Sequence, residues 1–84
     1  MTEMIDHAIA KRNISANIQR LLTQSKMSQS DLARETGDNR VYISRVARGI
    51  SEPTSSGLAR IAEALQVITD ELLQDPAKKL QHTP

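Results

Sequence analysis

The sequence contains no cysteine, tryptophan or phenylalanine, and a single tyrosine is its only aromatic residue. Without thiols, neither a disulfide framework nor a thiolate-ligated metal site is available. Glycine and proline occur only three times each, and no apolar run approaches the roughly 20 residues that a membrane-spanning helix needs. These absences exclude a disulfide-rich scaffold and a transmembrane helix.

What remains is a short chain with the composition of one folded domain. Of its 84 residues, 38% are hydrophobic and 25% are charged, which is a globular rather than a disordered balance. Two hydrophobic cores do not fit into a chain of this length. The first residues, MTEMIDHAIAKR, place acids ahead of a basic pair and lack an apolar stretch. They do not have the pattern of a secretory signal, so we expect a cytoplasmic protein that does not associate with membranes.

The sequence carries no pattern typical of catalysis. It has no paired catalytic carboxylates, no nucleophile with a base at helical spacing, and no glycine-rich phosphate loop. His7 and His82 are too far apart in sequence to suggest a metal site. We therefore expect no enzymatic activity, no metal, no cofactor and no small-molecule ligand, and the balance favours a binding protein.

Charge is distributed unevenly along the chain, although the net charge is only +1. Residues 11–48 hold eight cations and three carboxylates, a net charge of +5, whereas residues 1–10 and 49–84 each carry a net charge of −2. A local basic face on a nearly neutral protein is typical of a compact nucleic-acid reader. A solvated helix face without a partner would give the same pattern.

The spacing of apolar residues predicts helices and no strands, hence a compact all-α fold of five helices. The first helix has an apolar face at helical intervals, formed by Ile14, Ile18, Leu21 and Leu22. A fourth begins at Thr54 or Ser55, and its inward positions are Leu58, Ile61, Ala62 and Leu65. A short fifth helix covers residues 70–73 with acids in its first turn, and Pro76 is expected to end it.

Between the first and the fourth helix, residues 29–48 predict two helices that meet at a tight turn. Ser28 begins the first of the two in a capping-box-like arrangement with Asp31, and Gly37 ends it in the left-handed conformation. Asn39 caps the second, and Gly49 ends it. The small side chain of Ala33 allows close crossing of the two helices, and Ile43 and Val46 fill the angle between them. This arrangement is a helix-turn-helix, which places its second helix in the DNA major groove.

Around this motif the sequence resembles the phage-repressor-like Cro/repressor (XRE) family. The resemblance runs from about Ile14 to Leu73. The matching pieces are MSQSDLARETG, NRVYISRVARG, EPT, LARIAEALQV and DELL. It implies a five-helix all-α repressor-like domain that binds operator DNA, usually as a two-fold dimer.

Two positions depart from the family pattern. Leu22 and Ala47 stand where the family often has an arginine and a glutamate in a partly buried ion pair. Replacing both partners by apolar residues is often neutral or stabilising, so we interpret this as a coupled exchange. Ile68 stands where the family prefers a capping serine or threonine, which affects only where the last helix starts.

At about 100° per residue, residues 40–48 separate into a polar face and an apolar face. On the polar face we predict four contacts to bases, from Arg40, Val41, Ser44 and Arg45. Arginine can donate two parallel hydrogen bonds to guanine, and a valine suits the methyl group of thymine. Contacts to phosphate are predicted for Gln29, Asn39, Tyr42 and Arg48.

Some of these residues have a structural alternative. Asn39 is favoured as a helix cap over a phosphate ligand, and Tyr42 equally fits a ring that covers the core edge with its hydroxyl in water. In the family, a glutamine at the position of Gln29 contacts the backbone and braces the recognition helix. Arg34 and Asp38 are expected to pair at i, i+4.

A single recognition helix binds weakly, so a homodimer is predicted, with the two helices about 34 Å apart on one face of DNA. The expected interface is the fifth helix and its approach, with Val67, Ile68, Leu72 and Leu73. The alternative is that these residues close the core of the monomer.

The expected organisation has three parts. Residues 1–12 form an N-terminal arm or an extra helix, in which Lys11 and Arg12 have a minor-groove role as the less favoured option. Residues 13–75 form the DNA-binding domain, and residues 76–84 form a flexible tail.

Three functions fit these features. The favoured one is a sequence-specific transcriptional regulator, a short repressor, Cro-like protein or restriction–modification controller that reads a palindromic operator. The second is the antitoxin of a toxin–antitoxin pair, which would also bind a protein toxin. The third is a protein-interaction module without DNA binding, and the arginines on the polar face argue against it.

Overall fold

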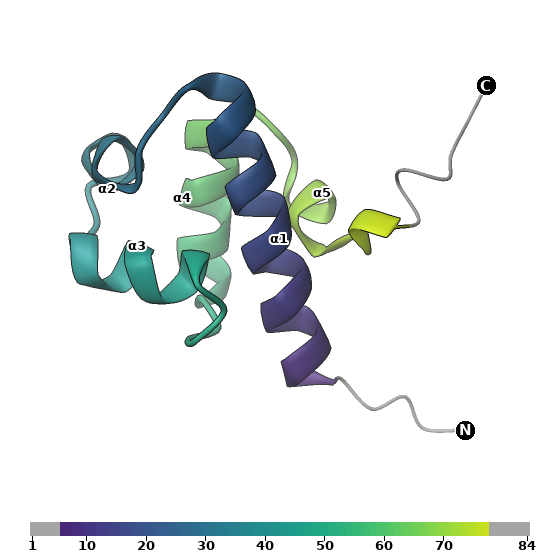
Figure 1. The fold of residues 1–84 in the computed structure, drawn as a ribbon. Coiled ribbons are helices and arrows are strands. Elements are labelled where there is room, and N and C mark those ends of the chain that lie inside the picture. The colour runs from purple at the N-terminus through teal and green to yellow at the C-terminus, as the bar shows by residue number, and fades with distance from the viewer. Residues whose placement is uncertain (1–5, 78–84) are drawn as a thin grey trace.

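The computed structural model describes residues 6–77 of the chain. Over this range the chain consists of helices joined by short turns and has no strand, which confirms the all-α prediction (Figure 1). The helices are α1 (His7–Ser25), α2 (Gln29–Thr36), α3 (Arg40–Ala47), α4 (Ser55–Leu65) and α5 (Thr69–Leu73). None of these helices is long and apolar enough to cross a lipid bilayer.

Helix α1 begins before the boundary expected at residue 12. Asp6 caps it, and its carboxylate accepts hydrogen bonds from the backbone N–H groups of Ala8 and Ile9. Lys11 and Arg12 therefore belong to a continuous helix rather than to an arm. The expectations for residues 1–5 and 78–84 lie outside the described residues.

Helix α5 ends at the predicted residue, but Pro76 does not have the predicted role. The helix ends at Leu73, before Pro76, and Gln74 adopts an extended conformation. Pro76 and Ala77 are helical again, and the backbone N–H of Ala77 donates to Asp75 Oδ1 at 2.9 Å. Proline suits the first turn of a helix because no hydrogen bond is required of its nitrogen there. Pro76 therefore starts a turn instead of stopping one.

The predicted helix caps are confirmed at α2, α3 and α4. Ser28 and Asp31 form a reciprocal capping box, and Gly37 ends α2 with a φ of 78°. Asn39 Oδ1 accepts from two backbone N–H groups at the start of α3, and Thr54 caps α4. At α5, Ile68 makes no side-chain cap. The four polar residues satisfy backbone donors that helices leave unpaired at their first turn.

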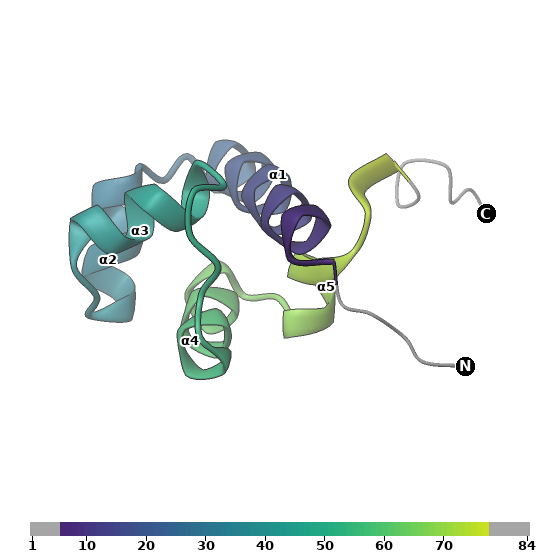
Figure 2. The ribbon, with the colours of Figure 1, turned by 90° about the horizontal axis from the view of Figure 1, so that it is seen from below.

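One continuous core joins all five helices. Its buried apolar side chains are Ile14, Ile18, Leu21, Leu22, Leu32, Ala33, Ile43, Val46, Ala47, Ile61, Ala62, Leu65 and Leu72. Figure 2, in which the molecule is turned by 90°, shows α1 and α3 along one side of the molecule and α4 and α5 along the other. Leu22 and Ala47 are both in the core, so the exchange of the family's ion pair leaves no buried charge there.

A buried asparagine ties α1 to the end of α5. The side chain of Asn17 is fully buried, and its Nδ2 donates to the carbonyl oxygens of Leu72 at 2.8 Å and Gln74 at 2.9 Å. Arg20 lies one turn further along and pairs with Glu71 of α5 at 3.8 Å. Buried polar groups cost free energy unless they are paired, and these bonds satisfy the last carbonyls of a helix of only five residues.

Candidate nucleic-acid interface

Helices α2 and α3 form the predicted helix-turn-helix. The backbone N–H groups of Gly37 and Asp38 both donate to the carbonyl of Ala33, at 2.9 and 3.1 Å. Gly37 adopts a positive φ of 78°, which a residue with a Cβ rarely does. Ala33 itself is buried, as the close crossing of the two helices requires. The local sequence therefore sets the angle at which α3 leaves α2.

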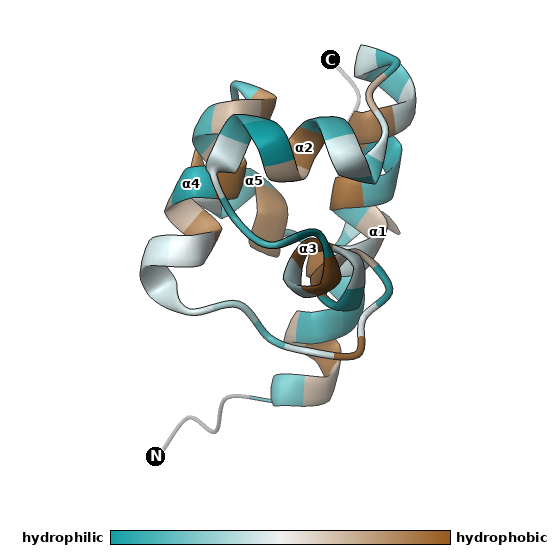
Figure 3. Ribbon diagram, turned by 90° about the vertical axis from the view of Figure 1, so that its left-hand side faces the viewer, coloured by the Kyte–Doolittle hydropathy of each residue, from teal (hydrophilic) through white to brown (hydrophobic). Residues whose placement is uncertain are grey.

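The other end of α3 is attached to α1. The carbonyl oxygen of Ala47 accepts hydrogen bonds from Ser15 Oγ at 2.6 Å and from Gln19 Nε2 at 2.8 Å. Figure 3 views the molecule nearly along α3, which lies among α2, α4 and α1. Helix α3 is therefore held by hydrogen bonds at both ends and presents one face to the exterior.

The outer face of α3 brings the predicted base-contacting residues together. Arg40, Val41 and Arg45 are exposed and Ser44 is half-buried, and with Arg48 they line one shallow hollow. Val41 is 64% exposed, although an apolar side chain gains nothing from that position in the free protein. The inward residues Ile43, Val46 and Ala47 are buried, as the helical periodicity predicts. The face is thus basic, with one apolar side chain available for contact.

Only one of the three arginines on this face is held by a neighbour. Arg45 Nε donates to Ser51 Oγ at 3.1 Å. In the described part of the chain, the side chains of Arg40 and Arg48 make no ion pair and no hydrogen bond. Ser51 could not be predicted as a partner from the sequence, because nothing in the local pattern marks a serine six residues away.

The remaining predicted phosphate ligands occupy different positions. Gln29 is the first residue of α2 and is half-buried. Asn39 is exposed, and its Oδ1 accepts from the N–H groups of Val41 at 2.6 Å and Tyr42 at 3.4 Å. The capping role favoured for Asn39 is confirmed. Its amide nitrogen is the group left to reach a phosphate.

Tyr42 does not fit its predicted contact with phosphate. Its hydroxyl oxygen is buried and has no hydrogen-bond partner. The ring packs against the core, and a Cβ added at Gly57 of α4 would lie 2.2 Å from that oxygen. The alternative of a hydroxyl in water is also wrong, because α4 covers it. Tyr42 is a packing residue between α3 and α4.

A basic hollow beside the end of α3 adds Arg12, for which a minor-groove role was only the less favoured prediction. Arg12 of α1 lines it together with Arg48 and smaller or uncharged residues, which are Ala8, Ser15, Ala16, Gln19 and Gly49. The side chain of Arg12 is exposed and has no partner within residues 6–77. Its recruitment to this face depends on the packing of α1 against α3, which the sequence pattern does not reveal.

The turn between α2 and α3 is clamped to α4. Arg60 Nη2 and Nε donate to the two oxygens of Asp38 at 2.9 and 3.2 Å. The hydrogen bond from Arg60 lowers the pKa of Asp38, and the same bond raises the pKa of Arg60. Arg34 instead pairs with Asp31, so the expected pair between Arg34 and Asp38 is wrong. The long-range partner wins because its guanidinium meets the carboxylate through two bonds.

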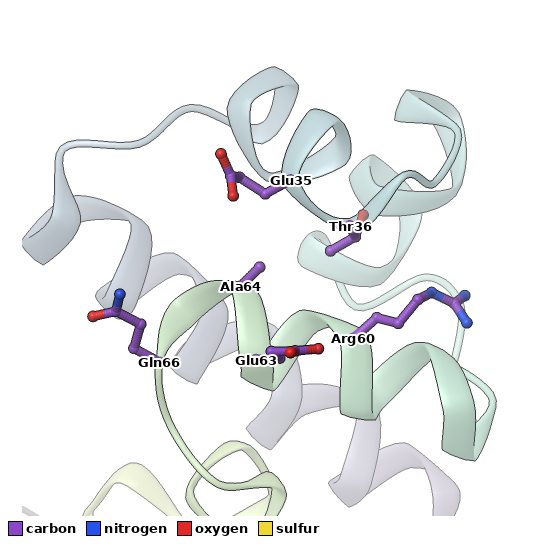
Figure 4. Close-up of a pocket in the computed structure, with 6 residues that line it drawn as sticks. All are labelled: Glu35, Thr36, Arg60, Glu63, Ala64 and Gln66. Carbon is purple, nitrogen blue, oxygen red and sulfur yellow. The ribbon is translucent and has the colours of Figure 1, made fainter.

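Behind this clamp, α2 and α4 border a polar pocket. Figure 4 shows Glu35 and Thr36 on α2 opposite Arg60, Glu63 and Ala64 on α4, with Gln66 at one end. Both signs of charge are present among the residues that line the pocket. Among residues 6–77 there is no cluster of three or more metal-ligating side chains.

The predicted dimer residues divide into two groups. Leu72 is fully buried in the core, so its assignment to an interface is wrong. Val67 is half-buried against the core. Ile68 and Leu73 are 69% and 44% exposed. Leu72 of α5 thus helps to close the core of the monomer, whereas Leu73 and the preceding Ile68 are exposed.

Comparison with known proteins places this arrangement in a family. The sequence model of the helix-turn-helix family matches residues 18–72, about two thirds of the chain. The chain therefore belongs to the helix-turn-helix family, of the XRE type that the resemblance predicted, which consists of DNA-binding transcription regulators. A search of curated proteins finds no significant match.

Solved structures are similar over nearly the whole chain. A hypothetical transcription factor, NHTF, from Neisseria has a TM-score of 0.83 at 28% identity, covering 96% of this chain and 93% of that one. A wild-type restriction–modification controller protein has a TM-score of 0.69 at 25% identity, covering 95% of this chain and 100% of that one. A transcriptional regulator from Vibrio cholerae has a TM-score of 0.77 at 23% identity, over 89% of this chain and 42% of that one, and shows likeness of fold alone.

Proposed function

We propose that the protein is a sequence-specific transcriptional regulator that inserts α3 into the DNA major groove. The observation that carries this proposal is the outer face of α3, where Arg40, Arg45 and Arg48 are exposed on a helix fixed at both ends. A basic, solvent-facing helix of about two turns fits a major groove about 12 Å wide.

The residues of this face divide by the chemistry that they offer. Arg40 and Arg45 suit the O6 and N7 atoms of guanine, Ser44 suits a polar base edge, and Val41 suits a thymine methyl. The contact with thymine would explain why Val41 is apolar although it is exposed on a basic face. These four side chains share one hollow, so they address neighbouring base pairs.

Contacts to phosphate border the base-reading residues. Gln29 stands at the first turn of α2, where backbone N–H groups and the helix dipole favour an anion. At the other end of α3, Arg48 and Arg12 line one hollow and have no protein partner in residues 6–77. With the amide of Asn39, these groups fix the register of α3 in the groove.

The regulator acts as a homodimer on a palindromic operator in this proposal. Ile68 and Leu73 supply the exposed apolar surface on which two copies meet, with Val67 beside them. Two-fold symmetry then presents two copies of α3 to half-sites one helical turn, about 34 Å, apart.

Among regulators, a short repressor or restriction–modification controller fits best. A controller protein of this kind aligns along its whole length with 95% of the chain. In such a protein, occupancy of the operator depends on protein concentration and dimerisation.

The test is selection of bound sites from random double-stranded DNA at about 150 mM salt, where non-specific phosphate binding is suppressed. An inverted repeat is the expected product. A variant with Arg40→Ala and Arg45→Ala is the matched control, and it should recover no repeat while remaining folded. Failure of the wild-type protein to enrich any sequence would overturn the proposal and direct the search to a protein partner.

A further inference from the structure

The three arginines on the outer face of α3 differ in their freedom. Arg40 and Arg48 extend from the helix without a partner in the described residues, whereas Arg45 Nε donates to Ser51 Oγ at 3.1 Å. An arginine with a free side chain samples many rotamers, and a hydrogen bond to the Nε–H group restricts the last of its torsions. Arg45 is therefore the one arginine of this face whose guanidinium is oriented before DNA arrives.

Ser51 is itself fixed by the backbone of the residue that it holds. The N–H groups of Ile50 and Ser51 both donate to the carbonyl oxygen of Arg45, at 2.9 and 3.3 Å. Gly49, with a φ of 78°, turns the chain back so that these bonds form. The serine is half-buried, and the segment after α3 thus folds back as a small bracket around Arg45.

The chemistry of the guanidinium makes this bracket selective. Its five N–H donors lie in one plane, with one on Nε and two on each terminal nitrogen. Once Nε–H is engaged by Ser51, the two terminal nitrogens remain free on the far edge. That pair of donors matches the O6 and N7 acceptors of guanine in the major groove.

We propose that Ser51 is a positioning residue for base recognition: it holds Arg45 so that the two terminal nitrogens face a guanine. The inference rests on the proposed function, because it needs α3 in the major groove. It predicts that the half-site position read by Arg45 is restricted to guanine more strongly than the position read by Arg40.

The size of the effect follows from the cost of ordering a long side chain on binding. Immobilising one such side chain lowers affinity by roughly 2- to 10-fold, and Ser51 removes part of that cost in advance. Ser51→Ala should thus weaken binding to the selected operator, by no more than that factor. Binding to DNA of unrelated sequence should not change, because in this proposal the Ser51 hydroxyl acts on Arg45 and not on phosphate.

The first experiment examines the contact without DNA. In protein labelled with ¹⁵N at arginine, the Arg45 Nε–H resonance should exchange with water more slowly than those of Arg40 and Arg48. Ser51→Ala should remove the difference, and Ser51→Thr, which keeps the hydroxyl, should retain it. If Arg45 exchanges as fast as Arg40 in the wild-type protein, the bracket does not exist and the proposal is overturned.

The second experiment is a double-mutant cycle on the selected operator, with Ser51→Ala, Arg45→Ala and the double variant. If Ser51 acts through Arg45, Ser51→Ala costs affinity only when Arg45 is present, and Ser51→Thr restores it. Ser25→Ala, which removes an exposed hydroxyl at the end of α1, is the matched control. An equal loss with and without Arg45, or on every DNA sequence, would refute the positioning role.

Failure of the proposed function gives a different pattern. In that case the wild-type protein binds all DNA alike although the slow Arg45 exchange is present, and the recognition role of Ser51 is overturned with it. Slow exchange together with a cycle that shows no coupling would overturn this inference alone.

Discussion

The carboxylate of Asp38, in the turn of the helix-turn-helix, accepts two hydrogen bonds from Arg60 of α4. The side chain of Asp38 is only 16% exposed. The turn that orients the recognition helix is therefore fastened to the helix behind it. Protonation of Asp38 would remove the charge that this link depends on.

Asp38→Asn should reduce the loss of stability in acid. The folded protein lowers the pKa of Asp38 below its usual value near 3.8, so the pair contributes stability above about pH 4 that is lost as the pH falls through the lowered pKa. The pKa of Arg60 is raised, and that side chain stays charged throughout. Thermal unfolding between pH 2 and pH 7 measures the effect. Equal acid dependence of the variant and the wild type would contradict it.

Gly57→Ala should destabilise the protein, although alanine is normally the better helix former by roughly 0.5–1 kcal/mol. The added Cβ would meet the Tyr42 hydroxyl at 2.2 Å, and overpacking of this kind costs about 1–3 kcal/mol. Urea unfolding gives the difference. Combining the change with Tyr42→Phe should recover much of the loss, because the clashing oxygen is then absent.

Tyr42→Phe by itself should be neutral or stabilising. The hydroxyl is buried without a partner, and an unpaired buried polar group costs about 1–3 kcal/mol. Affinity for DNA should be unchanged at every salt concentration. A lower affinity at equal stability would reinstate the phosphate contact and require the ring to move on binding.

Asn17→Ala should lower the free energy of unfolding by about 1–3 kcal/mol, because two carbonyl oxygens lose their donor. The amides of α5 should lose protection from hydrogen exchange first. Gln24→Ala, at an exposed position of the same helix, is the matched control and should have little effect. Uniform loss of protection in α4 and α5 would indicate that the asparagine serves the whole core instead.

Arg45→Ala and Arg48→Ala should weaken DNA binding in different ways. Loss of Arg45 should reduce the discrimination for one base pair by about 1–3 kcal/mol. Loss of Arg48 should weaken all sequences alike and reduce the slope of log affinity against log salt by about one. Titrations of operator and unrelated DNA at several salt concentrations separate the two. Identical behaviour of the variants would contradict the division of roles.

Ile68→Asp should dissociate the proposed dimer while the subunit stays folded, because this side chain is 69% exposed. Leu72→Ala should instead unfold the subunit, at a cost of about 2–5 kcal/mol, since Leu72 is fully buried in the core. Sedimentation at micromolar concentration, with circular dichroism of the same samples, distinguishes the outcomes. A wild-type protein that sediments as a monomer alone and on operator DNA would refute the dimer.

The features predicted well from sequence are those whose signal is local. Ser28 with Asp31, Asn39 and Gly37 act within one turn of chain, so residue type and spacing determine their roles. The inward periodicity of α3 is equally local, because three apolar residues within two turns define one buried side.

The errors arise where the partner is distant in sequence. Asp38 binds Arg60 rather than Arg34, and the Tyr42 hydroxyl is covered by a helix that begins at Ser55. Neither contact produces a regular spacing in the sequence from which it could be predicted. Leu72 shows the same problem, because an apolar residue on a short terminal helix gives the same sequence pattern whether it fills the core or contacts a second copy of the chain.

Within two turns, α1 binds both α5, which lies at the proposed dimer interface, and α3, which lies at the proposed DNA interface. Asn17 holds the end of α5, while Ser15 and Gln19 hold the last turn of α3. Helix α1 thus sets the distance between the two-fold axis of the proposed dimer and α3. Adding one base pair between the half-sites shifts and rotates one half-site relative to the other by a fraction of a helical turn. Two α3 helices at a fixed spacing cannot match this change. Operators should therefore tolerate changes in the bases between the half-sites far better than a change in their number.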